Sequence, residues 1–407
     1  MRSSTSTRTS DPTHLPRGLG ARPAVGRGLL PLGLVAAAVL LAGCGASGPR
    51  IRAATPEEAM STLSDRERPG VEKALAAAGP NASELASAIR SIEPEMRPGV
   101  AFLVATMPER DRTTLHADFL VTNTRLAYEA WRGAPWGHQI PEAMFLQYIL
   151  PYVNLNERRD DWRADFVGRF QAGAWKQSDP MEAVRWLNDH LNDEVKVHYH
   201  ASKRKKPDQS PYESMELNWA SCTGLSILLV DACRAAGIPA RCVGCPAWKK
   251  VTGNHTWVEV FGPDAQGHWR WFNVGDTGSD PRGENWVNER CREETDADDW
   301  SHAVWAACWR PSDHHFPLPW EWEIEYVPGL NVTRFYREPV EQAVAAPRPG
   351  PATVEAMWKG ELVARSTLKE GESSTTLHLA RGERFDVVVL YADGTRADLT
   401  VAVDAKP

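Results

Sequence analysis

Hydrophobic residues recur at two different spacings along this chain. Over residues 56–178 they return every three or four positions, which is the spacing of an amphipathic helix. Examples are Val71, Ala74, Leu75, Leu85, Ile89 and Ile92. In residues 352–407 they alternate with polar residues, which is typical of half-buried strands, and Asp393-Gly394 predicts a turn. The pattern therefore predicts a helical N-terminal subdomain and a small C-terminal β-rich domain.

Between these regions, residues 179–340 mix both spacings. We expect a helix over 180–190, a strand over 195–199, a helix from Cys222 to the stop at Gly237-Ile238-Pro239, strands over 240–245, 255–261 and 269–274, and a turn over 262–267. Helices followed by antiparallel strands are typical of an α+β core. A Pro-rich segment, residues 341–351, is expected to link this core to the β-rich domain.

The first 43 residues are expected to be a targeting segment and not part of the fold. Five arginines and one aspartate precede an apolar stretch from Leu29 to Leu41, which leads into Ala42-Gly43-Cys44. This order resembles a bacterial lipoprotein signal peptide over residues 1–43, with Cys44 as the lipidated first mature residue. The alternative is a simple membrane anchor or an uncleaved signal, although the stretch is short for a span. With residues 44–55 as a tether, the body would lie outside the cytoplasm, at the outer membrane or the periplasmic face of the envelope.

The charge of the chain argues against nucleic acid as a partner. The formal net charge is −7, and removal of residues 1–43, with five arginines and one aspartate, leaves −11. An acidic body repels a polyanion. The basic run Lys203-Arg204-Lys205-Lys206 stands beside Pro207 and Asp208 and is interpreted as a solvated loop. The N-terminal segment instead predicts the membrane as a partner, reached through a lipid on Cys44.

The candidate chemistry lies in a cysteine at the head of an apolar helix and a histidine that opens a strand. Ser221 is a good N-cap, which places Cys222 in the first helical turn. The positive end of the helix dipole and the unpaired N–H groups there favour a thiolate. His255 begins the β-rich run 255–261. A thiolate and an imidazole are the nucleophile and base of a Cys–His catalytic arrangement.

A third group should orient the imidazole, and the next strand offers two possibilities. If Phe261 pairs with His268, Asp276 lies diagonally on the same face as His255. A register shift of one residue places Asn273 opposite His255 instead. Both side chains can orient a catalytic imidazole, and Asp276 is preferred because a carboxylate stabilises imidazolium better.

The other cysteines and histidines predict no disulfide framework, no metal site and no cofactor. Cys233 lies eleven residues after Cys222, shares its helix face and is expected to be buried. The remaining pairs each lack a completing set of ligands; they are Cys242 and Cys245, His198 and His200, and His314 and His315.

Three sequence blocks together resemble the transglutaminase-like domain. They are Ser221-Cys222-Thr223-Gly224-Leu225-Ser226, Ala236-Gly237-Ile238-Pro239-Ala240-Arg241 and Gly253-Asn254-His255-Thr256-Trp257-Val258-Glu259-Val260. In that family the cysteine heads a core helix and the histidine strand carries the base. The resemblance covers about residues 180–312 and implies a cysteine-protease-like core over 179–340. One departure is Trp271–Thr277, where the family usually has an aromatic residue followed by Asp-Pro.

The resemblance implies acyl transfer on amide bonds of a protein or peptide substrate. Cys222 would attack the carbonyl, His255 would accept and return the proton, and an amine or water would resolve the thioester. The backbone N–H of Cys222 would be one oxyanion donor, with Asn218 or Trp219 as candidates for the second. Cross-linking transferase and peptidase or amidase both stay open. The alternative is a degenerate domain that binds a cell-envelope protein or peptide without turnover.

Overall fold

The computed structural model describes residues 51–275 and 279–405. Its N-terminal region is helical, as the spacing predicts. The elements are α1 (Pro56–Met60), α2 (Arg68–Ala77), α3 (Ala82–Ser91), α4 (Arg97–Thr106), α5 (Glu109–Arg112), α6 (Ala117–Gly133), α7 (Glu142–Tyr148), α8 (Arg163–Phe166) and α9 (Ala172–Ala174), with the short 3₁₀ turns η1 (Gly79–Asn81), η2 (Pro94–Met96) and η3 (Gly137–Gln139) and the π-helical η4 (Val167–Gln171). Leu85 and Ile89, one turn apart on α3, are both fully buried, because the apolar stripe of each helix faces its neighbours. Across the two described ranges, we find no helix with the length and apolar character that a bilayer crossing requires.

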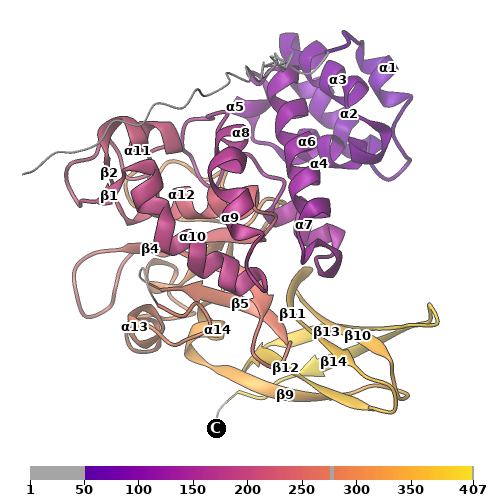
Figure 1. Ribbon diagram of the computed structural model, residues 1–407, viewed down its shortest axis with the longest axis vertical. Coiled ribbons are helices and arrows are strands. Elements are labelled where there is room, and N and C mark those ends of the chain that lie inside the picture. The colour runs from indigo at the N-terminus through magenta and orange to yellow at the C-terminus, as the bar shows by residue number, and fades with distance from the viewer. Residues whose placement is uncertain (1–50, 276–278, 406–407) are drawn as a thin grey trace, which may run out of the picture. The chain divides into compact units, whose positions relative to one another are not determined.

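The core follows the predicted α+β order. Its elements are α10 (Pro180–Val195), β1 (His198–Tyr199), α11 (Pro211–Leu217), β2 (Trp219–Ala220), α12 (Cys222–Ala235), β3 (Ala240–Cys245), β4 (His255–Pro263), β5 (Trp269–Val274), α13 (Trp286–Glu294), η5 (Trp300–His302), β6 (Trp305–Ala307), β7 (His314–His315), β8 (Pro328–Asn331) and α14 (Thr333–Arg337). The helix α12 packs against β3 and β4, and its Ile227, Leu228 and Val230 are fully buried. Figure 1 shows α10 and α12 between the N-terminal helices and the strands of the core.

One expected strand is shorter than predicted, because the preceding helix is longer. We expected a strand over 195–199, but α10 continues to Val195 and β1 contains only His198 and Tyr199. The helix continues because Leu187, Leu191 and Val195 repeat at four-residue spacing and are all buried. Lys196 then ends it in the left-handed conformation, with φ 58°. The short β1 pairs in parallel with β2, next to the Cys222 helix.

The C-terminal strands extend the core sheet. They are β9 (Pro339–Ala345), β10 (Ala352–Trp358), β11 (Glu361–Leu368), β12 (Ser374–Ala380), β13 (Arg384–Tyr391) and β14 (Arg396–Ala402). In the described residues, ten strands form one antiparallel sheet in the order β14-β13-β10-β11-β5-β4-β3-β6-β8-β7, in which β11 pairs with β5. The strands β12 and β9 form a separate pair (Figure 1). Residues 341–345, which we expected in the linker, therefore belong to β9, because their backbone groups pair with Ser374–His378.

A buried ion pair locks the centre of the sheet. Arg241 on β3 lies directly opposite Glu259 on β4, with Nη2 2.7 Å from Oε2, and both side chains are buried. Tyr336 donates to the other carboxylate oxygen at 2.5 Å and accepts from the indole N–H of Trp257 at 2.8 Å. The Arg241 guanidinium also covers the ring of Trp271 at 3.8 Å. These contacts fix the register of the strand that begins at His255.

Candidate active site

Cys222 begins α12, as the sequence predicts. The hydroxyl of Ser221 accepts a hydrogen bond from the Gly224 N–H at 3.3 Å, which is the expected N-cap. The same hydroxyl donates to the carbonyl oxygen of Pro207 at 2.7 Å, so the preceding loop holds the cap in place. The Cys222 side chain is half-buried, whereas the other described cysteines are buried. It therefore sits in the first turn of an anchored helix and still reaches a cleft.

His255 begins β4 and is surrounded by indole rings. Its imidazole stacks on Trp257, with ring centroids 5.8 Å apart and an interplanar angle of 20°. The ring of Trp286, the first residue of α13, lies 4.8 Å away on a tilted plane. Opposite His255, on β3, lies Cys245. The imidazole is half-buried and is flanked by large apolar surfaces that limit its motion.

Hydrogen bonds next to the candidate pair join the helix to the strand. Thr223, which follows Cys222, donates to the Thr256 hydroxyl at 3.0 Å, and Thr256 follows His255. Ser226 donates to the Thr256 carbonyl oxygen at 3.2 Å, one helical turn further along. Both threonines are buried. The fold thus places the first turn of α12 against the first residues of β4 and brings the predicted nucleophile and base into one neighbourhood.

Cys222 and His255 line the same cleft, which has a volume of about 470 Å³. Its walls come from α10, α12, β4, β5 and α13, and Trp257 and Trp286 supply aromatic surface. Asn188 of α10 lies on its wall and donates to the Gly275 carbonyl oxygen at 3.0 Å, which ties the helix to the end of β5. Tyr199, which is exposed, lines the cleft from β1. A cleft of this size with aromatic walls can hold a side chain and flanking peptide backbone.

The register that we predicted for the third residue is wrong. Phe261 pairs with Trp271 and not with His268, and Pro263 pairs with Trp269. The hairpin is tighter than assumed because one carboxylate oxygen of Asp264 accepts from the backbone N–H groups of Gln266 and His268, each at 2.8 Å, and so closes a short turn.

Asn273, one of the two candidates, consequently lies away from His255. It pairs with Glu259, four residues along the strand from His255, and its side chain borders a second cavity of about 330 Å³. The Asn273 amide donates to the side-chain oxygens of Asn285 and Asn288, at 3.0 and 3.2 Å. Asp276, the preferred candidate, lies outside the described residues, as does Cys44. The orienting role of Asp276 stays a prediction.

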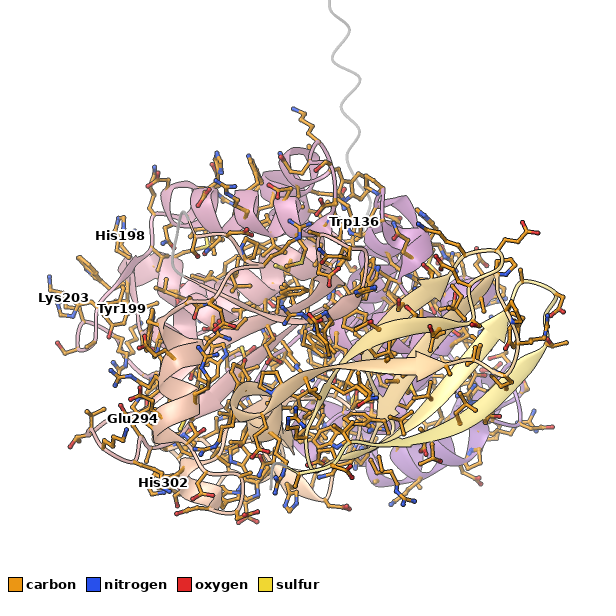
Figure 2. All side chains as sticks on the ribbon, turned by 90° about the horizontal axis from the view of Figure 1, so that it is seen from below. Trp136, His198, Tyr199, Lys203, Glu294 and His302 are labelled. Atoms are coloured by element: carbon orange, nitrogen blue, oxygen red, sulfur yellow. The ribbon has the colours of Figure 1, made fainter. Side chains whose placement is uncertain are left out.

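Asn218 and Trp219, the two candidates for the second oxyanion donor, are not among the residues that line the Cys222 cleft. Asn218 caps α11 in the left-handed conformation, with φ 60°, and its amide donates to the carbonyl oxygens of Lys196 and Met215. Trp219 packs against the rings of His198 and His200, and the Lys203 ammonium lies 4.4 Å above its indole ring. Figure 2 shows His198, Tyr199 and Lys203 together at one edge of the molecule. Asn218 and Trp219 therefore have structural contacts that sequence spacing did not reveal.

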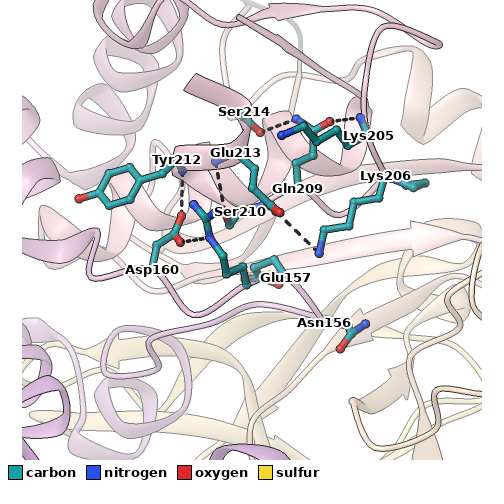
Figure 3. Close-up of polar contacts among 12 residues, drawn as sticks. Asn156, Glu157, Asp160, Lys205, Lys206, Gln209, Ser210, Tyr212, Glu213 and Ser214 are labelled. Atoms are coloured by element: carbon teal, nitrogen blue, oxygen red, sulfur yellow. Dashed lines mark hydrogen bonds and ion pairs between the residues drawn. The ribbon is translucent and has the colours of Figure 1, made fainter. Parts of the chain in front are cut away.

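The segment that supports the Ser221 cap is itself a dense polar network. Gln209 accepts from the Lys205 backbone N–H at 2.8 Å and donates to the Trp219 carbonyl oxygen at 3.1 Å. Ser210 and Glu213 form a reciprocal capping box at the start of α11, and the Glu213 carboxylate lies 3.7 Å from the Lys206 ammonium (Figure 3). The basic run predicted as a solvated loop thus contributes Lys205 and Lys206 to this network.

Asp208 lies in the same loop and is fully buried. Neither carboxylate oxygen has a hydrogen-bond partner in another described residue. Burial raises the pKa of Asp208 to about 6, with Lys206 opposing that shift and the Glu157 carboxylate adding to it. The loop that holds the Cys222 helix therefore contains a carboxyl group that titrates near neutral pH.

The remaining described cysteines are free thiols in apolar surroundings. Cys233 is buried as predicted, and burial raises its pKa. Burial likewise raises the pKa of Cys245 and of Cys308 to about 12. A protonated buried thiol is a poor nucleophile, so these groups are structural.

The fold also assembles a group that sequence spacing could not reveal. Asp264 and His268 flank the β4–β5 turn, and His378 joins them from β12, more than a hundred residues later in the chain. Their ligand atoms lie within 4.8 Å of one another. Such a distant partner leaves no local pattern to read, in contrast to Thr223 and Thr256, which stand next to the predicted catalytic pair.

Comparison with known proteins places this core in context. The model of the transglutaminase-like superfamily matches residues 170–275, which contain all three sequence blocks. No curated protein matches the chain significantly. The crystal structure of red sea bream transglutaminase aligns with 69% of this chain and 58% of its own chain, at 9% identity and a TM-score of 0.26. The aligned part thus spans less than two thirds of that transglutaminase. Residues 170–275, which include Cys222 and His255, form a transglutaminase-like domain.

Proposed function

We propose that this protein is a thiol enzyme that transfers acyl groups from amide bonds of proteins or peptides. The observation that carries the proposal is the shared cleft of Cys222 and His255, with the Thr223–Thr256 hydrogen bond beside them. The superfamily match over residues 170–275 supports the same class of chemistry. Because Cys222 is half-buried on the cleft wall, a substrate carbonyl can reach its sulfur.

The reaction begins with proton transfer from the Cys222 thiol to the His255 imidazole. The thiolate attacks the amide carbonyl, and the tetrahedral oxyanion accepts hydrogen bonds from N–H groups of the first helical turn, which have no carbonyl partner within the helix. The C–N bond breaks as His255 returns its proton to the leaving amine. The thioester is then attacked by a second amine, which gives a cross-link, or by water, which gives an acid, and Cys222 is regenerated.

Two further parts of the proposal concern orientation and location. Asp276 is the proposed orienting residue, because it stands two residues after the end of β5 in the sequence and is a carboxylate. Cys44 carries a lipid that anchors the chain to the outside of the bacterial envelope, on the strength of Leu41-Ala42-Gly43-Cys44 and the arginine-rich segment before it. Labelling of cells with a radioactive fatty acid tests the anchor. The label should be lost in Cys44→Ala, and label retained in that variant would contradict it.

Thiol reactivity tests the nucleophile directly. Iodoacetamide should alkylate Cys222 at neutral pH faster than it alkylates glutathione, and His255→Gln should slow that reaction, because the base no longer accepts the proton. Cys308→Ser is the matched control, since it removes a buried thiol elsewhere in the core. Alkylation of Cys222 at the rate of an ordinary thiol would contradict the proposal.

Two product assays separate the possible reactions. Incorporation of a labelled amine into casein detects transfer, whereas release of ammonia or of new amino termini detects hydrolysis. Either product should disappear in Cys222→Ala. If the wild-type chain binds peptides but forms neither product, and Cys222→Ala binds them equally well, the domain is a binding module and the enzymatic proposal is wrong.

A further inference from the structure

One carboxylate and two imidazoles meet where the core hairpin contacts the C-terminal strands. Asp264 directly follows β4, His268 directly precedes β5, and His378 lies on β12. All three side chains are mostly buried, with 12%, 25% and 22% of their surfaces exposed, respectively. They stand at the end of β4 opposite to His255, about 26 Å away at roughly 3.3 Å per residue. The cluster is therefore separate from the proposed catalytic cleft.

The Asp264 carboxylate is held in a fixed orientation. Its Oδ1 atom accepts from the backbone N–H groups of Gln266 and His268, each at 2.8 Å. Its Oδ2 atom faces both imidazoles, 3.1 Å from Nε2 of His378 and 3.4 Å from Nδ1 of His268. The turn backbone thus fixes one oxygen and presents the other to the two ring nitrogens, an arrangement that requires no rearrangement of the main chain to accept a ligand.

These distances suit a tetrahedral metal ion. Bonds of roughly 2.0–2.1 Å from zinc to nitrogen and oxygen place neighbouring ligand atoms about 3.3 Å apart. The Asp264 oxygen lies at 3.1 and 3.4 Å from the two nitrogens. The two nitrogens lie within 4.8 Å of each other, so the imidazole rings must approach by about 1.5 Å or less to reach the spacing of zinc ligands. Two imidazoles and a carboxylate are also a donor set that zinc accepts, with a water in the fourth position.

Charged neighbours of the cluster come from two strands. Glu341 of β9 lies directly opposite His378 of β12. Arg270, two residues after His268, lies on the same cavity as His378 and Glu341, and its guanidinium covers the ring of Phe272 at 3.9 Å. Glu341 adds negative charge that favours a bound cation, whereas the positive charge of Arg270 disfavours one. The charges around the cluster therefore neither favour nor exclude a metal ion. The distances among the three ligand atoms, and not the surrounding charges, favour a metal ion.

We propose that Asp264, His268 and His378 bind one divalent transition-metal ion, with zinc as the ion of best fit, and that this ion fastens the β4–β5 hairpin to the C-terminal strand β12. This site goes beyond the proposed acyl transfer and does not depend on it. Within the described residues, β12 pairs with β9 and not with the ten-stranded sheet. A metal at this point would join that outer pair to the core by coordinate bonds.

Zinc titration of the full-length chain tests the site. After removal of metal with a chelator, isothermal titration calorimetry should show saturable binding of one zinc ion that His378→Gln weakens by more than about 100-fold, because a ligand is lost. The glutamine can still hydrogen-bond to Asp264, so this variant separates metal binding from a simple hydrogen bond. His138→Gln, which changes an exposed histidine far along the chain, is the matched control and should bind zinc like the wild type.

A second variant and a second measurement make the test decisive. Asp264→Asn keeps an oxygen for the turn backbone and removes the negative charge, so it should also weaken zinc binding. Saturating zinc should raise the melting temperature of the wild type and of His138→Gln but not of either ligand variant. Circular dichroism of the metal-free proteins verifies that each variant folds, and Asp264→Asn decides if His378→Gln does not. The absence of saturable zinc binding, or unchanged affinity in a folded ligand variant, would overturn the proposal.

Discussion

The buried carboxyl group of Asp208 should make the stability of this protein depend on pH in an unusual direction. Most paired carboxylates stabilise a fold as the pH rises, because their folded-state pKa lies below the unfolded value. Burial instead raises the pKa of Asp208 from 3.8 to about 6. Between these values the folded protein binds more protons than the unfolded chain, so this group contributes stability below pH 3.8 that is lost as the pH rises through 6.

The size of the effect follows from the same shift. A displacement of about two pKa units corresponds to about 3 kcal/mol at 1.36 kcal/mol per unit. Because the unfolded group is already partly ionised at pH 4, the change expected between pH 4 and pH 8 is about 2–3 kcal/mol. Asp208→Asn removes the titration while keeping the shape of the side chain. The unfolding free energy of Asp208→Asn minus that of the wild type should therefore rise by about 2–3 kcal/mol between pH 4 and pH 8.

Urea unfolding followed by circular dichroism at several pH values measures this difference. Asp193→Asn, which removes an exposed carboxylate from α10, is the matched control. The reasoning is refuted if the difference between the wild type and Asp208→Asn varies with pH no more than the difference for the control. The loop also carries the Pro207 carbonyl that holds Ser221, so alkylation of Cys222 can be followed over the same pH series as a readout of the helix cap.

Three further substitutions test the supports of the cleft. Ser221→Ala removes the N-cap of α12 and should cost about 1 kcal/mol in unfolding free energy. A neutral result in urea unfolding would contradict the capping role. Thr256→Val removes the acceptor of the Thr223 hydrogen bond, so it should lower the unfolding free energy by about 1–3 kcal/mol and slow the alkylation of Cys222. If neither the unfolding free energy nor the alkylation rate changes, this hydrogen bond does not hold α12 against β4. Arg241→Met leaves the Glu259 carboxylate buried without its cation and should cost about 3–5 kcal/mol in unfolding free energy, measured by thermal or urea unfolding. The double variant Arg241→Met with Glu259→Leu should lose less, because no unpaired charge stays buried. Equal losses in the single and the double variant would argue against an ion pair.

The candidate site was readable from sequence where its determinants are local. Ser221 caps the helix through atoms three residues apart, so the position of Cys222 in the first turn follows from one short segment. The strand that begins at His255 follows from its alternating pattern in the same way. The register of β5 against β4 could not be predicted from the alternating pattern, because the way Asp264 closes the turn sets it. A shift of a few residues changes which side chains lie opposite His255.

Local patterns thus determined the order of helices and strands, the capped cysteine and the strand-leading histidine. The tertiary structure decided what lies across from them: Thr223 against Thr256, Arg241 against Glu259, and the pairing of β11 with β5 that continues the core sheet into the C-terminal strands. It also brought His378 to Asp264 and His268. The physical reason is that capping and periodicity act over a few residues, whereas strand pairing and burial join groups that are distant in sequence and leave no spacing to recognise.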